Sequence, residues 1–355
     1  MNDQSKPLAE AVQEAFQNKT PLKLVGGDSK AFLPNPCDAA PLSLAEHRGV
    51  VSYEPTELVI TARSGTSLTE LRETLADKGQ HLPFEPPGFA PSATLGGTLA
   101  CGLSGPARPY AGAARDMVLG TRIINGKGES LKFGGEVMKN VAGYDLSRLM
   151  VGAFGTLGLI TEASLKVLPV PPATKTLSFS MDQAEAIRRC NEWAGQPYPI
   201  TATAWNANQL YVRLSGAAQA VESAHKSLGG ELEADNGLWN ELAEHKHPFF
   251  RPLSEDESLW RLSVPQTAAV IDNLQETLVE WGGGQRWIIS TEGDDLLRDI
   301  ATKLGGHATR FRSAGEPRAG VFQAPKPGLM AVHTRVKQAM DPAGILNPCV
   351  LYPEF

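Results

Sequence analysis

The residues best suited to chemistry in this sequence lie in a short glycine-rich loop. The stretch "LVGGDSKAF" places Gly26 and Gly27 after an apolar run, followed by Asp28, Ser29 and Lys30. Glycines allow successive backbone N–H groups to converge on one concavity, which is a common way to bind phosphate oxygens. A serine hydroxyl can add a hydrogen bond, and a lysine ammonium can offset negative charge. The loop therefore predicts a phosphate-binding site.

Two further segments share this character. The stretch "ATLGGTLACGLSGP" spans residues 93–106, and "MVGAFGTLGLITEASLKV" spans residues 150–167. Three glycine-rich segments within about 140 residues indicate a long ligand, such as a dinucleotide, that lies against bare backbone. Glycine also marks ordinary turns, and a turn is the simpler interpretation of each segment taken alone.

Two common nucleotide-binding signatures are absent from the sequence. No G-x-G-x-x-G motif follows a strand and opens a helix, which disfavours a Rossmann domain. No G-x-x-x-x-G-K-[ST] motif occurs either, which disfavours a P-loop NTPase. If a dinucleotide binds, the fold that holds it is of another kind.

Composition restricts the class of protein. The 355 residues suggest about two domains, and 42% hydrophobic with 20% charged residues is typical of a globular protein. The net charge of −6 argues against nucleic acid as the main partner, because phosphate binding favours a basic face. The four cysteines form no C-x-x-C pair, so no iron–sulfur cluster and no metal site is expected in this chain. Scattered thiols and the lack of a run of about 18 apolar residues predict a cytoplasmic protein, and leave open a peripheral position on the inner face of the cell membrane.

Local patterns predict several elements in the first half. Apolar residues at helical spacing indicate a helix over residues 7–18. The run Ser67-Leu68-Thr69-Glu70 is a capping box that opens a second helix. Two extended runs on either side of Asn125-Gly126-Lys127-Gly128 indicate a hairpin.

Three prolines in "VLPVPP" (residues 167–172) predict a domain boundary. Beyond it, strands and helices alternate, including a helix expected over residues 266–284. This rhythm predicts an antiparallel sheet with helices on one face. The expected fold class is therefore α+β, with a first domain at 1–170, a second at 171–325, and a C-terminal helix and tail at 326–355.

Four segments in order, "GGDSKAF", "SATLGGTLACGLSG", "KNVAGYDLSRLMVGAFGTLGLITEASLKV" and "DPAGILNP", resemble the vanillyl-alcohol oxidase/PCMH flavoprotein family. The third is the most specific, because it joins many residues at fixed spacing. The resemblance covers residues 20–170 and the final fifteen residues. Within the family, the phrase "GGEVMKNVAGYDLSRL" is similar to FAD-binding subunits of bacterial glycolate oxidases. The resemblance implies a PCMH-type FAD-binding domain of two α/β subdomains, followed by an α+β cap domain with an antiparallel sheet.

The resemblance also implies which residues contact FAD. The first loop, Gly26, Gly27, Asp28, Ser29 and Lys30, would cradle the pyrophosphate. The other implied contacts are Ser92, Thr94, Gly96 and Gly97 across the pyrophosphate, Gly102 and Gly105 near the flavin, Gly158 and Ile160 at the adenosine end, and Asn347 at the flavin ring. Members of the family usually read NPG in the tail, whereas this chain has Cys349 in place of the glycine.

Two absences refine this interpretation. Some relatives attach FAD covalently through a histidine in the first loop, but no histidine of this chain precedes residue 47, so non-covalent FAD is expected. Hydroxyacid dehydrogenases of the family carry a GDGN-type metal and substrate motif with nearby histidines in the second domain, and this chain has no such motif. His245 and His247 are expected at the surface, because histidines two residues apart on a helix point to different faces.

No catalytic acid–base pair can be identified from the sequence. Tyr144 and Asp145 lie in the family-like "GYDL", yet a structural role is equally compatible, with Asp145 capping the helix that follows. Arg108 and Arg115 could hold a carboxylate, although surface or phosphate-binding roles fit them as well. The catalytic residues therefore stay unassigned.

The predicted function is an FAD-dependent oxidoreductase acting on CH–OH groups, as a subunit of a glycolate-oxidising complex. The resemblance implies a second FAD-bearing catalytic subunit and an iron–sulfur subunit as partners, and a small hydroxyacid as substrate. Two alternatives stay open: a stand-alone FAD dehydrogenase of another 2-hydroxyacid or alcohol, and an assembly subunit whose FAD is structural. The sequence does not decide whether this chain oxidises substrate itself or relays electrons.

Overall fold

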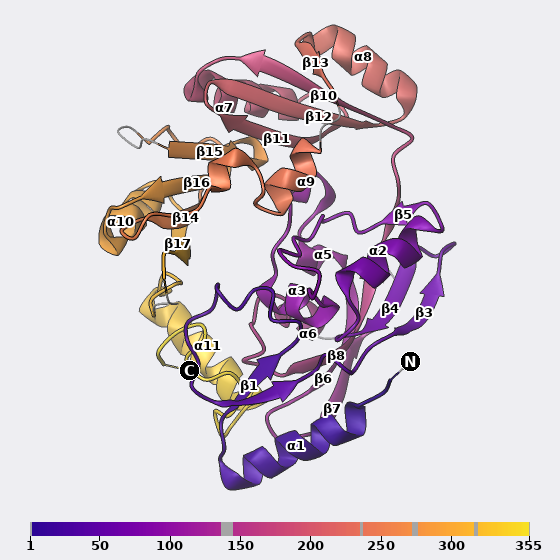
Figure 1. The fold of residues 1–355 in the computed structure, drawn as a ribbon, viewed down its shortest axis with the longest axis vertical. Coiled ribbons are helices and arrows are strands. Elements are labelled where there is room, and N and C mark those ends of the chain that lie inside the picture. Colours follow the sequence, from indigo (N-terminus) through magenta and orange to yellow (C-terminus); the bar gives the residue numbers. More distant parts are fainter. Residues whose placement is uncertain (1, 136–144, 235–236, 272–275, 316–318, 355) are drawn as a thin grey trace. The chain divides into compact units, whose positions relative to one another are not determined.

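The computed structural model describes residues 2–135, 145–234, 237–271, 276–315 and 319–354 (Figure 1). The chain divides into two compact units. The first unit comprises Met1–Leu103, Ala113–Pro169 and Ala324–Phe355, and the second comprises Ser104–Gly112 and Val170–Gln323. Among the described residues, no helix combines the length and the apolar character needed to cross a membrane.

A five-stranded antiparallel sheet forms the centre of the first unit, in the order β3-β4-β8-β6-β7. Its strands are β3 (Val50–Glu54), β4 (Val59–Arg63), β6 (Val118–Ile124), β7 (Ser130–Gly134) and β8 (Leu159–Lys166). The predicted hairpin is confirmed, because β6 and β7 pair antiparallel on either side of the glycine-rich turn. Helix α2 (Leu68–Ala76) begins as predicted, with the Ser67 hydroxyl accepting a hydrogen bond of 3.0 Å from the Glu70 amide.

Shorter elements surround this sheet. Helix α1 (Ser5–Asn18) packs Leu8, Val12 and Ala15 against a two-stranded parallel sheet of β1 (Leu22–Val25) and β2 (Ala40–Ser43) and against the C-terminal tail. The remaining elements of this unit are β5 (Gln80–His81), α3 (Leu95–Cys101), α5 (Ala114–Met117), α6 (Leu146–Leu149), β9 (Leu168–Pro169) and α11 (Pro327–Met340).

The second unit contains one eight-stranded sheet in the order β13-β10-β12-β11-β15-β16-β14-β17, and every neighbouring pair is antiparallel. Its strands are β10 (Ala173–Ser180), β11 (Ile200–Asn206), β12 (Gln209–Gly216), β13 (Glu231–Glu233), β14 (Ser258–Ser263), β15 (Glu276–Glu280), β16 (Gln285–Ser290) and β17 (His307–Ser313). Its helices are α4 (Arg108–Ala111), α7 (Gln183–Ala194), α8 (Ala218–Leu228), α9 (Leu238–Ala243) and α10 (Asp294–Lys303), with short 3-10 turns at Pro248–Phe250 and Trp281–Gly283.

Three of these helices cover the same face of the sheet, as the sequence predicts. α7 and α8 pack on the apolar side chains of β10 and β12, and α10 packs on Trp260, Leu262 and Ile288. The strand register carries both groups to one face, which we call the helix face. The short helix α9 lies over the opposite face, where the Trp239 indole N–H donates to the Thr176 hydroxyl at 2.9 Å.

The helix expected over residues 266–284 is wrong. The structure has strand β15 in the second half of that range, hydrogen-bonded to β11 on one side and to β16 on the other. Leu278 and Val279 are both buried, so β15 is a central strand, and its pairing on two sides outweighs the helical spacing of the apolar residues.

Candidate functional site

The first glycine loop and the start of the second glycine segment lie directly against each other. A Cβ atom added to Gly27 would lie 1.5 Å from the Ser92 carbonyl oxygen, and one added to Gly26 would lie 2.5 Å from the Thr94 hydroxyl oxygen. The Ser92 hydroxyl donates a hydrogen bond of 2.6 Å to the Gly27 carbonyl. Both glycines are therefore required by the close approach of two chain segments.

The backbone of this loop keeps free hydrogen-bonding capacity. Within the described part of the chain, the N–H groups of Gly26, Gly27, Asp28 and Ser29 donate to no protein acceptor. Asp28 adopts a left-handed conformation with φ of 55°, a turn geometry in which consecutive N–H groups can converge on an anion. Four consecutive partly or fully exposed residues with unused amides fit the pyrophosphate of a dinucleotide.

A positive charge lies next to this loop inside the protein. Lys30 is only 6% exposed, and its Nζ lies 3.4 Å from both the Ser29 hydroxyl and the Gly88 carbonyl. Burial raises the pKa of the Cys101 thiol to about 11, while the nearby charge of Lys30 acts in the opposite direction. A buried ammonium beside unused amides favours a negatively charged ligand, and Cys101 is a protonated thiol at neutral pH.

The second and third glycine segments also touch each other. Gly102 ends helix α3 in the left-handed conformation, with φ of 64°, and a Cβ there would lie 3.1 Å from the Gly152 backbone. At the other end of α3, the Thr94 hydroxyl accepts from the Gly97 amide at 3.3 Å, and Gly96 packs against Ser64, where a Cβ would lie 2.6 Å from the serine Cβ. The small residues of this helix thus allow it to lie against β4 and the 150s loop.

The last predicted residues lie where the third segment meets the tail. Gly158 precedes β8, and a Cβ there would lie 2.9 Å from the Ile123 side chain, while Ile160 is buried opposite Ile123. The Asn347 side chain accepts from the Leu24 amide at 2.7 Å and donates to the Phe154 carbonyl at 2.6 Å. Asn347 therefore connects β1 to the third glycine segment through its side chain.

A buried ion pair that the sequence did not indicate fixes the tail in this place. The Lys337 ammonium donates to the Asp341 carboxylate at 2.7 Å and to the carbonyls of Thr156 and Leu346 at 2.8 Å. Asp341 also accepts from the Leu346 amide at 2.8 Å. The two charged side chains are 3% and 1% exposed, so they hold the tail against the third segment away from water. The i, i+4 spacing on a helix was the available sequence signal.

One of the fourteen predicted contacts belongs to the second unit. There, the Gly105 carbonyl accepts a hydrogen bond of 3.2 Å from the Trp281 indole N–H.

Asp145 caps α6 as predicted, with its carboxylate accepting a hydrogen bond of 3.1 Å from the Arg148 amide. Tyr144 lies outside the described residues.

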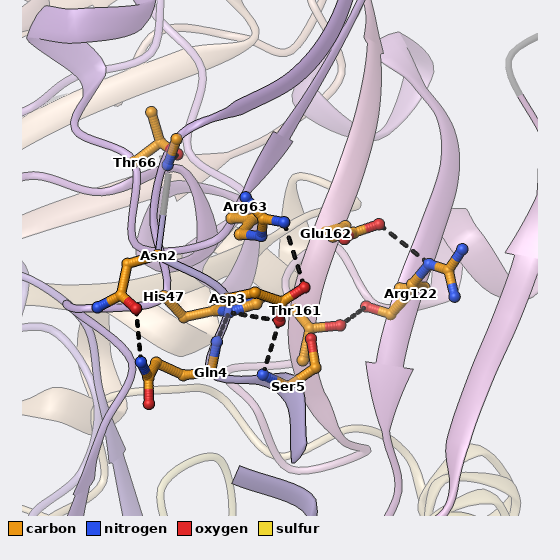
Figure 2. Close-up of polar contacts among 11 residues, drawn as sticks. Asn2, Asp3, Gln4, Ser5, His47, Arg63, Thr66, Arg122, Thr161 and Glu162 are labelled. Atoms are coloured by element: carbon orange, nitrogen blue, oxygen red, sulfur yellow. Dashed lines mark hydrogen bonds and ion pairs between the residues drawn. The ribbon is translucent and has the colours of Figure 1, made fainter. Parts of the chain in front are cut away.

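The first histidine of the chain, His47, has a structural role. His47 is fully buried, and its Nδ1 accepts a hydrogen bond of 2.9 Å from the Gln4 amide (Figure 2). Asp3 pairs with Arg63 at 3.2 Å beside it, and burial lowers the pKa of His47 below its usual range. His47 therefore holds the N-terminal segment to the first unit, and the first glycine loop contains no histidine that could attach a flavin.

The surface position predicted for His245 is wrong. His245 lies beyond α9, at φ of 53°, with its ring stacked 3.8 Å from Phe250 and edge-on to Trp287 at 4.7 Å. Burial, and then the charges of Arg312 and Arg261, hold the pKa of His245 well below its usual range. The neighbouring aromatic side chains of β16 and β17 bury this ring, which helix periodicity could not predict. Among the described residues, no group of three or more acidic, histidine or cysteine side chains is arranged to hold a metal ion.

Comparisons with known proteins show what this chain is similar to. Residues 3–134 match the model of an FAD binding domain family. The chain is 48% identical to glycolate oxidase subunit GlcE of Escherichia coli (strain K12), over 99% of both chains. It is 33% identical to glycolate oxidase subunit GlcD of Bacillus subtilis (strain 168), over 39% of this chain and 29% of that protein. Among solved structures, alkyldihydroxyacetonephosphate synthase superposes with a TM-score of 0.67 at 18% identity, over 98% of this chain and 75% of that one, which concerns the fold alone.

Proposed function

Because the chain belongs to the family of glycolate oxidase subunit GlcE, we propose that it is the FAD-binding subunit of a glycolate oxidase. The observation that carries this proposal is the 48% identity over 99% of both chains, since a likeness of that extent includes both units. The match of residues 3–134 to an FAD binding domain identifies the cofactor class. The reaction is then the oxidation of glycolate to glyoxylate, a CH–OH oxidation.

Specific parts of the first unit would hold the cofactor. The unused amides of Gly26 to Ser29 and the buried ammonium of Lys30 would hold the pyrophosphate. Ser92, Thr94, Gly96 and Gly97 would line the other side of the pyrophosphate, Gly102 would allow close approach near the flavin, Gly158 and Ile160 would contact the adenosine end through main-chain groups, and Asn347 would approach the flavin ring. When bound, FAD accepts two electrons as a hydride and can release them one at a time. The chain contributes binding and orientation, and we expect the attachment to be non-covalent.

We propose that this subunit works in a complex. A second FAD-bearing subunit similar to GlcD would be one partner, because both relatives are named as subunits of glycolate oxidase. An iron–sulfur subunit would then accept single electrons from the flavins. The four cysteines are free, which suits a reducing cytoplasm, and contact with the inner face of the cell membrane would come through the assembled complex.

The test is dye reduction by the purified chain, alone and with its partner subunits, at matched flavin content. The proposal predicts one FAD per chain and rapid reduction of the dye by glycolate only in the complex. Equal rates for the lone chain and the complex would favour a stand-alone dehydrogenase. A complex that stays fully active when this chain is stripped of FAD would favour a structural cofactor.

A further inference from the structure

The second unit has a cationic site on the face of its sheet opposite the helix face. In β14, Trp260 and Leu262 point to the helix face, so Arg261 between them points to the other side. The strand register places Trp287 of β16 and Thr309 of β17 on either side of Arg261. Arg261 thus lies on an interior strand of the sheet, between β16 and the edge strand β17.

A bulge brings further residues to this face. The register of β14 and β17 shifts between Leu259 and Trp260, so β17 has one extra residue at that point. As a result Phe311 lies 4.9 Å from the Trp287 ring, while Arg312 is opposite Leu259. The guanidinium carbons of Arg261 and Arg312 lie 5.7 Å and 5.9 Å from the Phe311 ring centre.

The charge of Arg261 is not compensated within the protein. In the described part of the chain, its guanidinium has no ion pair and no hydrogen bond, although the side chain is only partly exposed. Two carboxylates of β15 lie on the same face and are engaged elsewhere: Glu280 accepts hydrogen bonds from Gln285 at 3.0 Å and from Trp287 at 2.7 Å, and Glu276 pairs with Arg251. Withdrawing an arginine from water without a partner is unfavourable, so a negatively charged ligand would be stabilised beside this guanidinium.

Neighbouring groups strengthen the positive potential. Arg108 lies with its guanidinium 4.6 Å from the Trp281 ring. Burial, and then the charge of Arg108, lower the pKa of Arg261 to about 10. The pKa of His307 is lowered by burial and by Arg261, as His245 is by burial, Arg312 and Arg261. These groups respond to one cationic region, in which Arg261 remains charged at neutral pH.

We propose that the Arg261 site binds the carboxylate of a small 2-hydroxyacid, with Arg108 and Arg312 adding positive charge around it. The planar fork of a guanidinium matches the two oxygens of a carboxylate, and the side chains of Trp287 and Phe311 lie beside Arg261. This inference rests on the proposed function, because that function supplies the hydroxyacid. It places a substrate-binding group in this chain's own second unit.

The test uses the FAD-loaded full chain titrated with glycolate and with oxalate, followed by calorimetry and by tryptophan fluorescence, since Trp287 lies beside the site. Glycolamide has the shape of glycolate without the charge and serves as the neutral probe, and inorganic phosphate tests a different anion. The variants are Arg261→Gln and Arg261→Lys. Arg251→Gln is the matched control, because Arg251 is an arginine of the same unit that pairs with Glu257 and Glu276.

The expected result is saturable oxalate and glycolate binding to wild type, at least tenfold weaker binding to Arg261→Gln, and an intermediate loss in Arg261→Lys. Arg251→Gln should bind as wild type, and glycolamide and phosphate should bind more weakly than oxalate. Arg261→Gln should melt no lower than wild type, because it removes an uncompensated charge. Equal oxalate affinity in wild type and both Arg261 variants, or tighter binding of phosphate, would overturn the inference.

The failure of this inference can be told apart from failure of the proposed function. If the assembled complex oxidises glycolate but oxalate affinity is the same with and without Arg261, only the proposed carboxylate site is refuted. If the complex has no activity with glycolate while Arg261 still governs oxalate binding, the proposed reaction is wrong and a carboxylate site remains.

Discussion

Replacing Gly27 by alanine separates two reasons for a glycine at this position. The sequence suggests that a side chain would obstruct a bound phosphate. The structure gives a reason within the protein, because the added Cβ would lie 1.5 Å from the Ser92 carbonyl oxygen. Gly27 has no positive φ, so the strain comes from this contact and not from the backbone conformation. The variant should therefore be destabilised even without cofactor.

The magnitude follows from the contact. Real Cβ atoms do not come within 3.0 Å of such an atom, so the two segments must separate by at least about 1.5 Å. The hydrogen bond of 2.6 Å between the Ser92 hydroxyl and the Gly27 carbonyl would then be lost, at a cost of about 1 kcal/mol. Overpacking of this kind costs about 1–3 kcal/mol, which gives about 2–4 kcal/mol in total. For a unit of this size, that lowers the melting temperature by roughly 4–15 °C.

The assay is thermal unfolding of the apo protein, together with the ratio of flavin to protein after purification from cells. We expect Gly27→Ala to fold, to melt lower and to lose most of its FAD. Gly328→Ala is the control, because Gly328 has no positive φ, a Cβ there meets no atom within 4 Å, and alanine favours the helix. A Gly27→Ala protein that melts within about 1 °C of wild type and keeps one FAD per chain would refute the reasoning.

Three further outcomes are expected. Lys337→Met should lower the free energy of unfolding by about 3–5 kcal/mol in denaturant titrations, because Asp341 stays buried without its partner. The control variant Gln338→Met, at an exposed neighbouring position, should change the free energy of unfolding little. Equal effects of the two substitutions would contradict the prediction. The pKa of His245 is well below 6.5 in the folded chain, so below that pH the unfolded chain binds more protons and the free energy of unfolding falls. His245→Phe should reduce this loss of stability between pH 6.5 and 5 by up to about 1.4 kcal/mol per pH unit. An unchanged dependence of stability on pH would contradict this prediction. Acid precipitation should release all the FAD, whereas yellow colour left in the pellet would show covalent attachment.

The sequence predicts well those features that depend on neighbouring residues. The Ser67 cap, the turn between β6 and β7 and the helices α7 and α8 follow from patterns of a few residues, and the structure confirms each of them. The α+β class also follows, because the order of strands and helices sets the layers. A resemblance to a known family supplied the cofactor, which no local pattern identified by itself.

Features that depend on distant residues could not be predicted. The run that becomes β15 has apolar residues at spacings compatible with a helix, and only its two neighbouring strands make it a strand. The alternation in "SLWRLS" places Arg261 on one face but does not say whether that face is solvated or covered. His245 is likewise enclosed by rings from β16 and β17, which are more than 40 residues away in the chain.

The residues assigned to FAD by resemblance divide into two groups with different physical roles. Gly26, Gly27, Gly96 and Gly102 lack side chains because other parts of the chain occupy that space, and the Asn347 side chain is hydrogen-bonded to two backbone groups. The amides of the first loop have no such partner in the described chain. A substitution in the first group changes the scaffold before it changes any contact with a ligand, so lost FAD in such a variant does not by itself identify a ligand contact. The amides of the first loop are the groups that a phosphate can reach without rearranging the scaffold.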